Sequence, residues 1–124
     1  MATVTASDAG VEVATRAAVT RFAEAFDRQD VDAVMAAMTD DCVFETTAPP
    51  DGLRHEGKVA VRAAWTAFFR ESAGAVFEAE ELLVSGDRAV VRWRYAWDCG
   101  HVRGVDVFRV RDGRVAEKAS YVKG

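Results

Sequence analysis

The sequence predicts an α+β fold in which helices come first and a curved antiparallel sheet follows. Three segments before residue 70 carry apolar residues at every third or fourth position, the spacing of amphipathic helices. After residue 74 the pattern changes to strands rich in Val, Phe, Trp and Tyr, separated by short turns. Short turns join neighbouring antiparallel strands, and helices must bury their apolar faces. We therefore expect the helices to pack on one face of the sheet.

Each predicted helix rests on one apolar stripe. The stripes run over residues 19–26, 31–38 and 61–68. Asp30 precedes the second stripe and is a good N-cap, because its carboxylate can accept a hydrogen bond from a free N–H of the first turn. Gly57 lies ahead of the third stripe, where a glycine marks the boundary between two elements. Because all three segments show the same helical spacing, the sequence predicts three helices.

One short strand precedes the third helix, and four longer strands follow it. The short strand, residues 42–47, ends at the Pro- and Gly-rich turn 49–52. Long strands twist and curl, and a curled sheet covered by helices leaves a cavity at its wide end, the usual ligand site in such a shape. The four later strands are predicted over residues 75–84, 88–98, 101–110 and 114–122.

The charge balance argues against nucleic acid as a partner. The chain has 16 Lys and Arg against 20 Asp and Glu, and a net charge of −4, whereas binding to a phosphate backbone depends on clustered basic residues. No apolar run reaches the roughly 20 residues that a membrane-spanning helix needs, and the N-terminus lacks the pattern of a secretory signal. We expect a cytoplasmic protein, and the excess of Arg over Lys is typical of GC-rich bacterial genomes.

A single domain is expected to account for almost the whole chain of 124 residues. Residues 1–10 are small and polar and are predicted to form a flexible tail, and residues 11–124 to form the domain. Cys42 and Cys99 form no CxxC motif and no His/Cys cluster, so neither a metal site nor a redox dithiol is predicted. No phosphate-binding loop is present either, and we expect no cofactor.

Asp106 is the strongest candidate for a catalytic group. It interrupts an otherwise apolar strand segment, Gly104–Phe108. Burial disfavours the charged form of a carboxylic acid, so an Asp that faces a cavity there can both accept and donate a proton, as acid/base catalysis requires. The alternative places Asp106 on the outer face of the sheet, solvated or paired with an Arg on a neighbouring strand.

Two strand registers predict two different sites. If Asp98 and His101 flank a two-residue turn, Trp93 lies opposite Asp106, and Trp93, Tyr95 and Trp97 line an aromatic slot. A slip of one residue would instead bring the other face of this strand, with Arg92 and Arg94, beside Asp106, forming a positive site for an enolate or carboxylate. The sequence leaves both registers open, and the aromatic residues could also be plain core.

Other side chains are candidates for the cavity wall or for a supporting role. The aromatic residues of the helices are expected mainly to form the core and secondarily to line the pocket. His55 precedes the third helix in a polar loop, and Lys118 and Ser120 lie on the last strand, where either face is possible. The predicted lining comprises Phe22, Phe44, Thr46, Trp65, Trp93, Tyr95, Phe108 and Ser120, with Arg94, Lys118 and His55 as alternative polar groups.

Three segments resemble SnoaL-like proteins of the nuclear transport factor 2-like superfamily. They are residues 21–33 of the first helix, the strand end Asp41-Cys42-Val43-Phe44-Glu45, and the closing hairpin 104–115, and the resemblance covers residues 12–124. It implies a cone: a strongly curved antiparallel sheet wrapped around three helices, the cystatin-like α+β roll. It also implies a homodimer that pairs through the outer surface of the sheet.

The resemblance can be carried over residue by residue. Asp106 matches the oxyanion-binding Asp of ketosteroid isomerase and the general acid/base of the polyketide cyclases. Phe22 and Thr46 stand where the isomerase has its Tyr and its base, so that mechanism is not expected. In the epoxide hydrolases Arg94 would match the catalytic Arg, but Ala96 and Ser120 stand where two Asp are needed.

The resemblance and the residues together imply a small-molecule-binding protein. The first hypothesis is a cofactor-independent acid/base enzyme of the isomerase, cyclase or dehydratase type, in which Asp106 transfers a proton on a hydrophobic carbonyl-bearing or polycyclic substrate. The alternative is a non-catalytic protein that binds such a ligand or serves a partner as a dimeric accessory protein. No nucleic acid, membrane or metal is implied by either reading.

Overall fold

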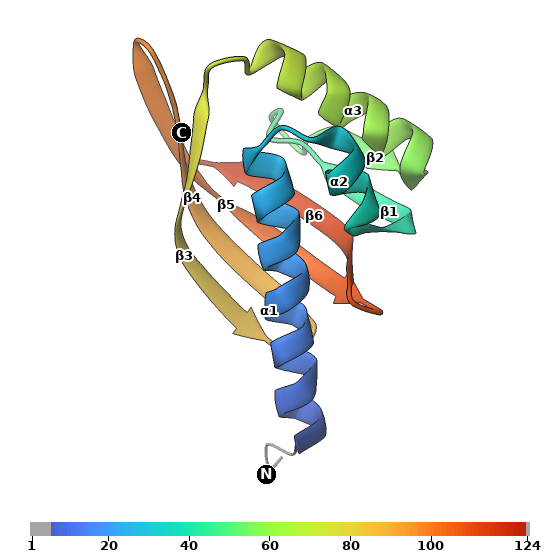
Figure 1. Ribbon diagram of the computed structural model, residues 1–124. Helices are drawn as coiled ribbons and strands as arrows, with labels where there is room; N and C mark the ends of the chain where they lie inside the picture. Colours follow the sequence, from blue (N-terminus) through green and yellow to red (C-terminus); the bar gives the residue numbers. More distant parts are fainter. Residues whose placement is uncertain (1–5, 124) are drawn as a thin grey trace.

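The computed structural model describes residues 6–123 and has the predicted α+β architecture, with all three helices in the first 71 residues (Figure 1). The sheet is strongly curved and does not close into a barrel. In chain order the elements are α1 (Ala6–Asp27), α2 (Val31–Ala36), β1 (Met38–Glu45), β2 (Arg54–Glu56), α3 (Gly57–Glu71), β3 (Val76–Ser85), β4 (Arg88–Trp97), β5 (Gly100–Arg111) and β6 (Arg114–Val122).

The six strands lie in the order β2-β1-β6-β5-β4-β3. All neighbours are antiparallel except β1 and β6, which run parallel, so the prediction of a fully antiparallel sheet was wrong at this one pair. Hairpin turns set the direction of β3 to β6, but β1 reaches the sheet through α2 and no short turn joins it to β6. The turn signals in the sequence therefore carried no information on that pair.

The observed elements differ from those predicted most clearly at three places. α1 begins at Ala6, so residues 6–10 are helical rather than part of a tail, and residues 1–5 lie outside the described residues. The second helix ends at Ala36, and Met38 begins β1 instead of ending the helix, because its side chain is fully buried against the sheet. The three residues of β2 pair with the end of β1, where the sequence predicted a loop.

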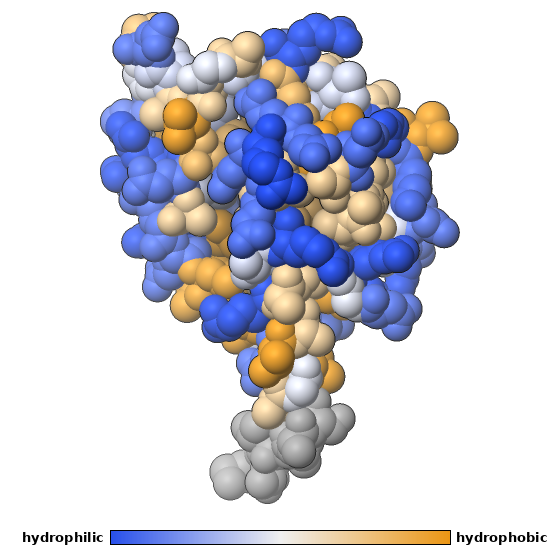
Figure 2. All heavy atoms as spheres, viewed as in Figure 1, coloured by the Kyte–Doolittle hydropathy of each residue, from blue (hydrophilic) through white to orange (hydrophobic). Residues whose placement is uncertain are grey.

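The helices cover the concave face of the sheet at two places. α1 crosses β3 to β6, and α3 lies over β1 and β2 (Figure 1). Asp30 caps α2 as predicted, since its carboxylate accepts a hydrogen bond of 3.1 Å from the backbone N–H of Ala33. The first part of α1 extends past the sheet and exposes Val11 and Val13, where Figure 2 shows hydrophobic surface on an otherwise largely hydrophilic face.

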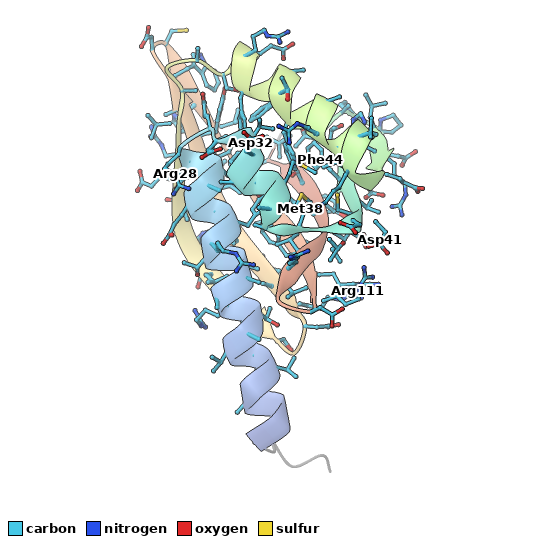
Figure 3. The ribbon with its side chains drawn as sticks, turned by 45° about the vertical axis from the view of Figure 1, so that its right-hand side comes forward. Arg28, Asp32, Met38, Asp41, Phe44 and Arg111 are labelled. Carbon is cyan, nitrogen blue, oxygen red and sulfur yellow. The ribbon has the colours of Figure 1, made fainter. Side chains whose placement is uncertain are left out.

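An aromatic cluster fills the space between the helices and the sheet. Phe22 and Phe26 of α1 pack on Trp65 of α3, with ring centroids 6.1 Å and 5.3 Å from the indole. Phe44 of β1 packs on the same indole, with ring centroids 3.9 Å apart. Away from this cluster, Arg111 at the end of β5 forms an ion pair with Asp41 of β1, on the other side of β6 (Figure 3). The cluster joins both helices to the sheet strands that carry the candidate site.

One tight approach between strands depends on a glycine. A methyl group at Gly104 of β5 would lie 2.5 Å from the Trp93 ring of β4 and closer still to the Tyr121 carbonyl oxygen of β6. No other residue type leaves the ring room to lie over β5. Gly104 thereby sets the position of Trp93 on the concave face.

We expect Gly104→Ala to lower the free energy of unfolding by about 1–3 kcal/mol, the usual cost of overpacking. Urea unfolding followed by circular dichroism measures this. Gly10→Ala is the matched control: Gly10 lies in exposed α1 with nothing within 4 Å of the added methyl group, so it should stabilise the protein by about 0.5–1 kcal/mol. Equal effects of both substitutions would contradict the close packing at Gly104.

Candidate active site

The register of β4 and β5 decides which face of β4 looks inward. Trp97 pairs with Gly100, so the turn is Asp98-Cys99, and Trp93 lies opposite Gly104 rather than opposite Asp106 as predicted. The observed register therefore differs by two residues from the first of the two registers that the sequence left open. An even shift keeps every side chain on the same face. Trp93 and Tyr95 consequently share the concave face with Asp106, whereas Arg92 and Arg94 lie on the outer face.

A cavity of about 500 Å³ lies between the concave face, α3 and the end of β1. This volume suits a small organic molecule of a few fused rings. Of the residues predicted for its wall, Phe44, Thr46, Trp65, Trp93, Tyr95, Ser120, Asp106, Lys118 and His55 all line it. Phe22 and Phe108 line a smaller space of about 40 Å³ beside it, which Asp106 and Lys118 also border.

The sequence analysis missed several wall residues, and four of them show why. Phe77 on β3 and Val102 on β5 follow the same two-residue alternation as Tyr95, so the register would have revealed them. Leu53 and Glu71 lie outside the strands, before β2 and at the end of α3. No periodic pattern in the sequence points to these last two positions.

Asp106 lies beneath the helices, with 7% of its surface exposed. Its Oδ1 accepts a hydrogen bond of 2.7 Å from Ser120 Oγ, and its Oδ2 lies 3.4 Å from Lys118 Nζ. The carboxyl group is therefore removed from bulk water, but it is not alone in apolar surroundings as the sequence suggested. A buried cation and a hydroxyl donor hold it, and both come from β6.

A one-residue irregularity brings these partners to the cavity. The register of β5 and β6 shifts between Arg109 and Val110, where β6 contains one residue more than β5. If the residues of β5 and β6 paired one to one from the turn onward, Lys118 and Ser120 would lie on the outer face. With the shift, Ser120 lies opposite Asp106. Lys118, two residues earlier on β6, lies opposite Phe108 and therefore on the same face.

Lys118 is 4% exposed and is surrounded by aromatic rings. Its Nζ lies 4.3 Å from the ring centroid of Phe26 and 4.7 Å from that of Trp65, with Phe44 and Phe22 at 5.4 Å and 5.7 Å. Burial lowers the pKa of the Lys118 ammonium, and the neighbouring Asp106 carboxylate offsets this shift only in part. The cavity therefore holds an amine that gives up its proton more readily than a surface lysine.

Two buried indole N–H groups add unused donors to the site. Nε1 of Trp65 and Nε1 of Trp93 are buried, and neither has a hydrogen-bond partner among the described residues. Both rings line the cavity. Buried polar groups are nearly always satisfied in folded proteins, so an unpartnered pair in one cavity is consistent with donors kept for a bound acceptor.

The remaining polar candidates have other partners or positions. The hydroxyl oxygen of Thr46 accepts hydrogen bonds from the backbone N–H groups of Ala48 and Leu53, at 3.3 Å and 3.0 Å. His55 lies on β2 with its ring stacked on Phe44 at 6.0 Å, partly buried at the cavity wall rather than free in a surface loop. Within residues 6–123 no three His, Cys, Asp or Glu side chains are grouped to hold a metal ion.

The lowered pKa of Lys118 predicts a pH dependence of stability. Between that lowered pKa and the ordinary lysine value of about 10.4, the unfolded chain binds more protons than the folded one, so stability rises with pH. The double variant Asp106→Asn/Lys118→Met removes both charges and should lack this contribution. Urea midpoints at about pH 7 and about pH 10 measure it. Parallel curves for the two proteins would exclude a perturbed Lys118.

The same fold occurs in several proteins of known structure. An NTF2-like protein of unknown function from Mesorhizobium loti is 41% identical, with 91% of this chain and 93% of that chain covered and a TM-score of 0.81. A candidate polyketide cyclase from Sinorhizobium meliloti is 30% identical over 83% of this chain and 92% of that chain, with a TM-score of 0.72. A candidate ketosteroid isomerase from Kribbella flavida, 21% identical over 91% of this chain and 80% of that one, has a TM-score of 0.77 and shows the fold alone.

The family comparison agrees with these structures. No curated protein matches the chain. In the described part of the structure, no helix combines the length and apolar character needed to cross a membrane. The model of the SnoaL-like domain matches residues 19–118, which include α2, α3, most of the cavity lining and the Asp106–Lys118 pair. The chain therefore belongs to the SnoaL-like family, as the three sequence segments had indicated.

Proposed function

We propose that the protein is a cofactor-independent acid/base enzyme, of the isomerase, cyclase or dehydratase type, that acts on a hydrophobic carbonyl-bearing or polycyclic substrate. The observation that carries this proposal is the Asp106–Lys118 pair, buried in the wall of an aromatic cavity. A titratable pair in a cavity, removed from water, is the usual composition of a proton-transfer site. The candidate polyketide cyclase among the similar structures supports the same class of chemistry.

The cavity wall favours a flat apolar ligand with an acceptor oxygen. Aromatic rings from β1, β3, β4 and α3 offer stacking surface, and the lining is predominantly apolar. The free N–H groups of Trp65 and Trp93 are donors without an acceptor. A carbonyl oxygen supplies that acceptor, and the rest of a fused-ring ketone fills a volume of about 500 Å³.

The chemistry follows from the charges of the pair. The Asp106 carboxylate removes a proton from the carbon next to the carbonyl group, and negative charge develops on the carbonyl oxygen. The Lys118 ammonium and an indole N–H stabilise that charge, because electrostatic interactions are stronger in a cavity without water. Asp106 then returns the proton at another position. Ser120 holds the carboxylate in place through its 2.7 Å hydrogen bond.

We propose non-catalytic ligand binding as the second function. Both oxygens of Asp106 already have partners in Ser120 and Lys118, so the carboxylate could serve structure alone. The hydroxyl of Thr46 is also engaged by backbone groups. In this reading the cavity sequesters the same apolar carbonyl compound without turnover.

Asp106→Asn separates the two functions. With 2-tetralone in D₂O, proton NMR should show exchange of the hydrogens next to the carbonyl, and the substitution should lower its rate about 10²–10⁴-fold, the typical contribution of a general base. Asp98→Asn in the exposed β4–β5 turn is the matched control and should leave the rate unchanged. Saturable tetralone binding with no exchange in the wild-type protein would support binding alone.

We also propose that two copies pair through the outer face of the sheet, in the cytoplasm. This face exposes Leu83 and Tyr121, at 57% and 55%, and it also carries the positively charged Arg92 and Arg103. A depression of about 560 Å³ lies there, larger than the inner cavity, but it is open and no buried titratable group lines it. These features suit a contact surface better than a reaction site.

Leu83→Glu tests this pairing. A charge in the centre of an apolar contact is costly to desolvate, so sedimentation should show a dimer for the wild-type protein and a monomer for the variant. Val59→Glu, on exposed α3 away from the outer face of the sheet, is the control and should remain dimeric. A wild-type protein that sediments as a monomer at every concentration would refute the proposal.

A further inference from the structure

The position of Lys118 gives its amine a second chemical capacity. Nζ is buried at the junction of the two inner spaces, among the rings of both helices and of β1. Among the described residues it forms an ion pair with Asp106 alone. Lys58, by contrast, pairs with Asp40 on the surface, and Lys123 is exposed. Only one of the three lysines of this chain is therefore presented to an apolar ligand.

We propose that Lys118 is a nucleophilic amine that forms an imine with the carbonyl carbon of the bound ligand, while Asp106 moves the protons. The inference rests on the proposed function in one respect, because it requires a carbonyl-bearing ligand in the same cavity. It adds a covalent step, and it restricts the substrate class to aldehydes and ketones. Esters and amides do not form such an imine.

The apolar surroundings favour the reactive form of the amine. Two charges without water are costly, and transfer of one proton from the Lys118 ammonium to Asp106 leaves a neutral amine beside a neutral acid. Desolvation in an apolar pocket is a recognised way to make a lysine nucleophilic. Other titratable groups on the elements around Lys118 are Asp27 on α1, His55 on β2 and Glu71 on α3, which line the same inner spaces.

The step balances with the groups present. The Nζ lone pair attacks the carbonyl carbon and forms the C–N bond, while the electron pair of the C=O bond moves to oxygen, which takes the Asp106 proton. The nitrogen gives a proton to the Asp106 carboxylate, and this proton then passes to the hydroxyl group, which leaves as water. Ketone, neutral amine and neutral acid thus become iminium, carboxylate and one water. The product is again a buried ion pair, between iminium and Asp106.

Reductive trapping tests this inference directly. The full-length protein is incubated with 2-naphthaldehyde and sodium cyanoborohydride at about pH 7, and the adduct is located by peptide mass mapping. Because burial lowers the pKa of Lys118 and the cavity holds the aldehyde beside its amine, Lys118 should carry several-fold more label than Lys58 or Lys123. Label confined to those two lysines and the N-terminal amine would overturn the proposal.

Three further samples exclude trivial explanations. In 8 M urea, on the order of the concentration that unfolds small domains completely, the preference for Lys118 should disappear. A preference that persists there would mean that local sequence, not the cavity, causes the reactivity, and would overturn the proposal. Lys118→Arg retains the positive charge but should give no adduct at position 118, and Lys58→Arg should leave the Lys118 adduct unchanged. Circular dichroism establishes that each variant is folded.

The pH profile supplies an independent readout. Trapping at Lys118 should reach half its maximum at a lower pH than trapping at Lys58, since burial lowers the pKa of the amine. Asp106→Asn should slow adduct formation, because the variant lacks the acid that protonates the departing hydroxyl group. Equal profiles for the two lysines would show an unperturbed amine and would overturn the inference.

The two proposals fail in different ways. If hydrogen exchange depends on Asp106 but no adduct forms at Lys118, the proton-transfer function stands and the imine step is wrong. If the adduct forms while tetralone shows no exchange, the lysine is nucleophilic and the isomerase-type function is wrong. The hydrogen-exchange assay and the trapping assay therefore test the two proposals separately.

Discussion

The ion pair between Asp106 and Lys118 is the constraint around which the rest of the structure is organised. Each of these groups, buried without its partner, would cost several kcal/mol of desolvation. Here the carboxylate has both Lys118 and the Ser120 hydroxyl as partners, and four aromatic rings surround the Lys118 amine. The aromatic cluster is thus more than a core: it surrounds a charged pair that the sheet alone could not shield from water.

The position of this pair connects packing to chemistry. α1 supplies Phe22 and Phe26, and α3 supplies Trp65, so both helices must dock before Lys118 is shielded. The same docking leaves open the space of about 500 Å³ beside the pair. Water is excluded from the functional groups by the elements that form the wall of the cavity. Stability and reactivity of the site therefore depend on the same contacts.

The sequence offered the aromatic wall as one of two open alternatives, and the structure selected it. The register considered for that wall differs by two residues from the observed one, and an even shift leaves Trp93 and Tyr95 on the face of Asp106. Asp30 as the N-cap also followed from a local pattern, because it depends only on which end of a helix a residue occupies. The sequence left Asp106 open between a cavity and the outer face of the sheet, and the structure buries it.

By itself, then, the sequence determined the α+β class, the three helices and the family, since each depends on periodicity or on short motifs. The β4–β5 pairing in the structure decided which face of β4 looks inward. The tertiary structure alone decided the partners of Asp106. One extra residue in β6, Ala116, shifts the register between β5 and β6 and turns Lys118 and Ser120 inward. Neither the parallel β1–β6 pair nor this bulge has a signature in local sequence, because both arise from how distant strands align. A register error of one residue changes the face, and only the alignment of the whole sheet excludes it.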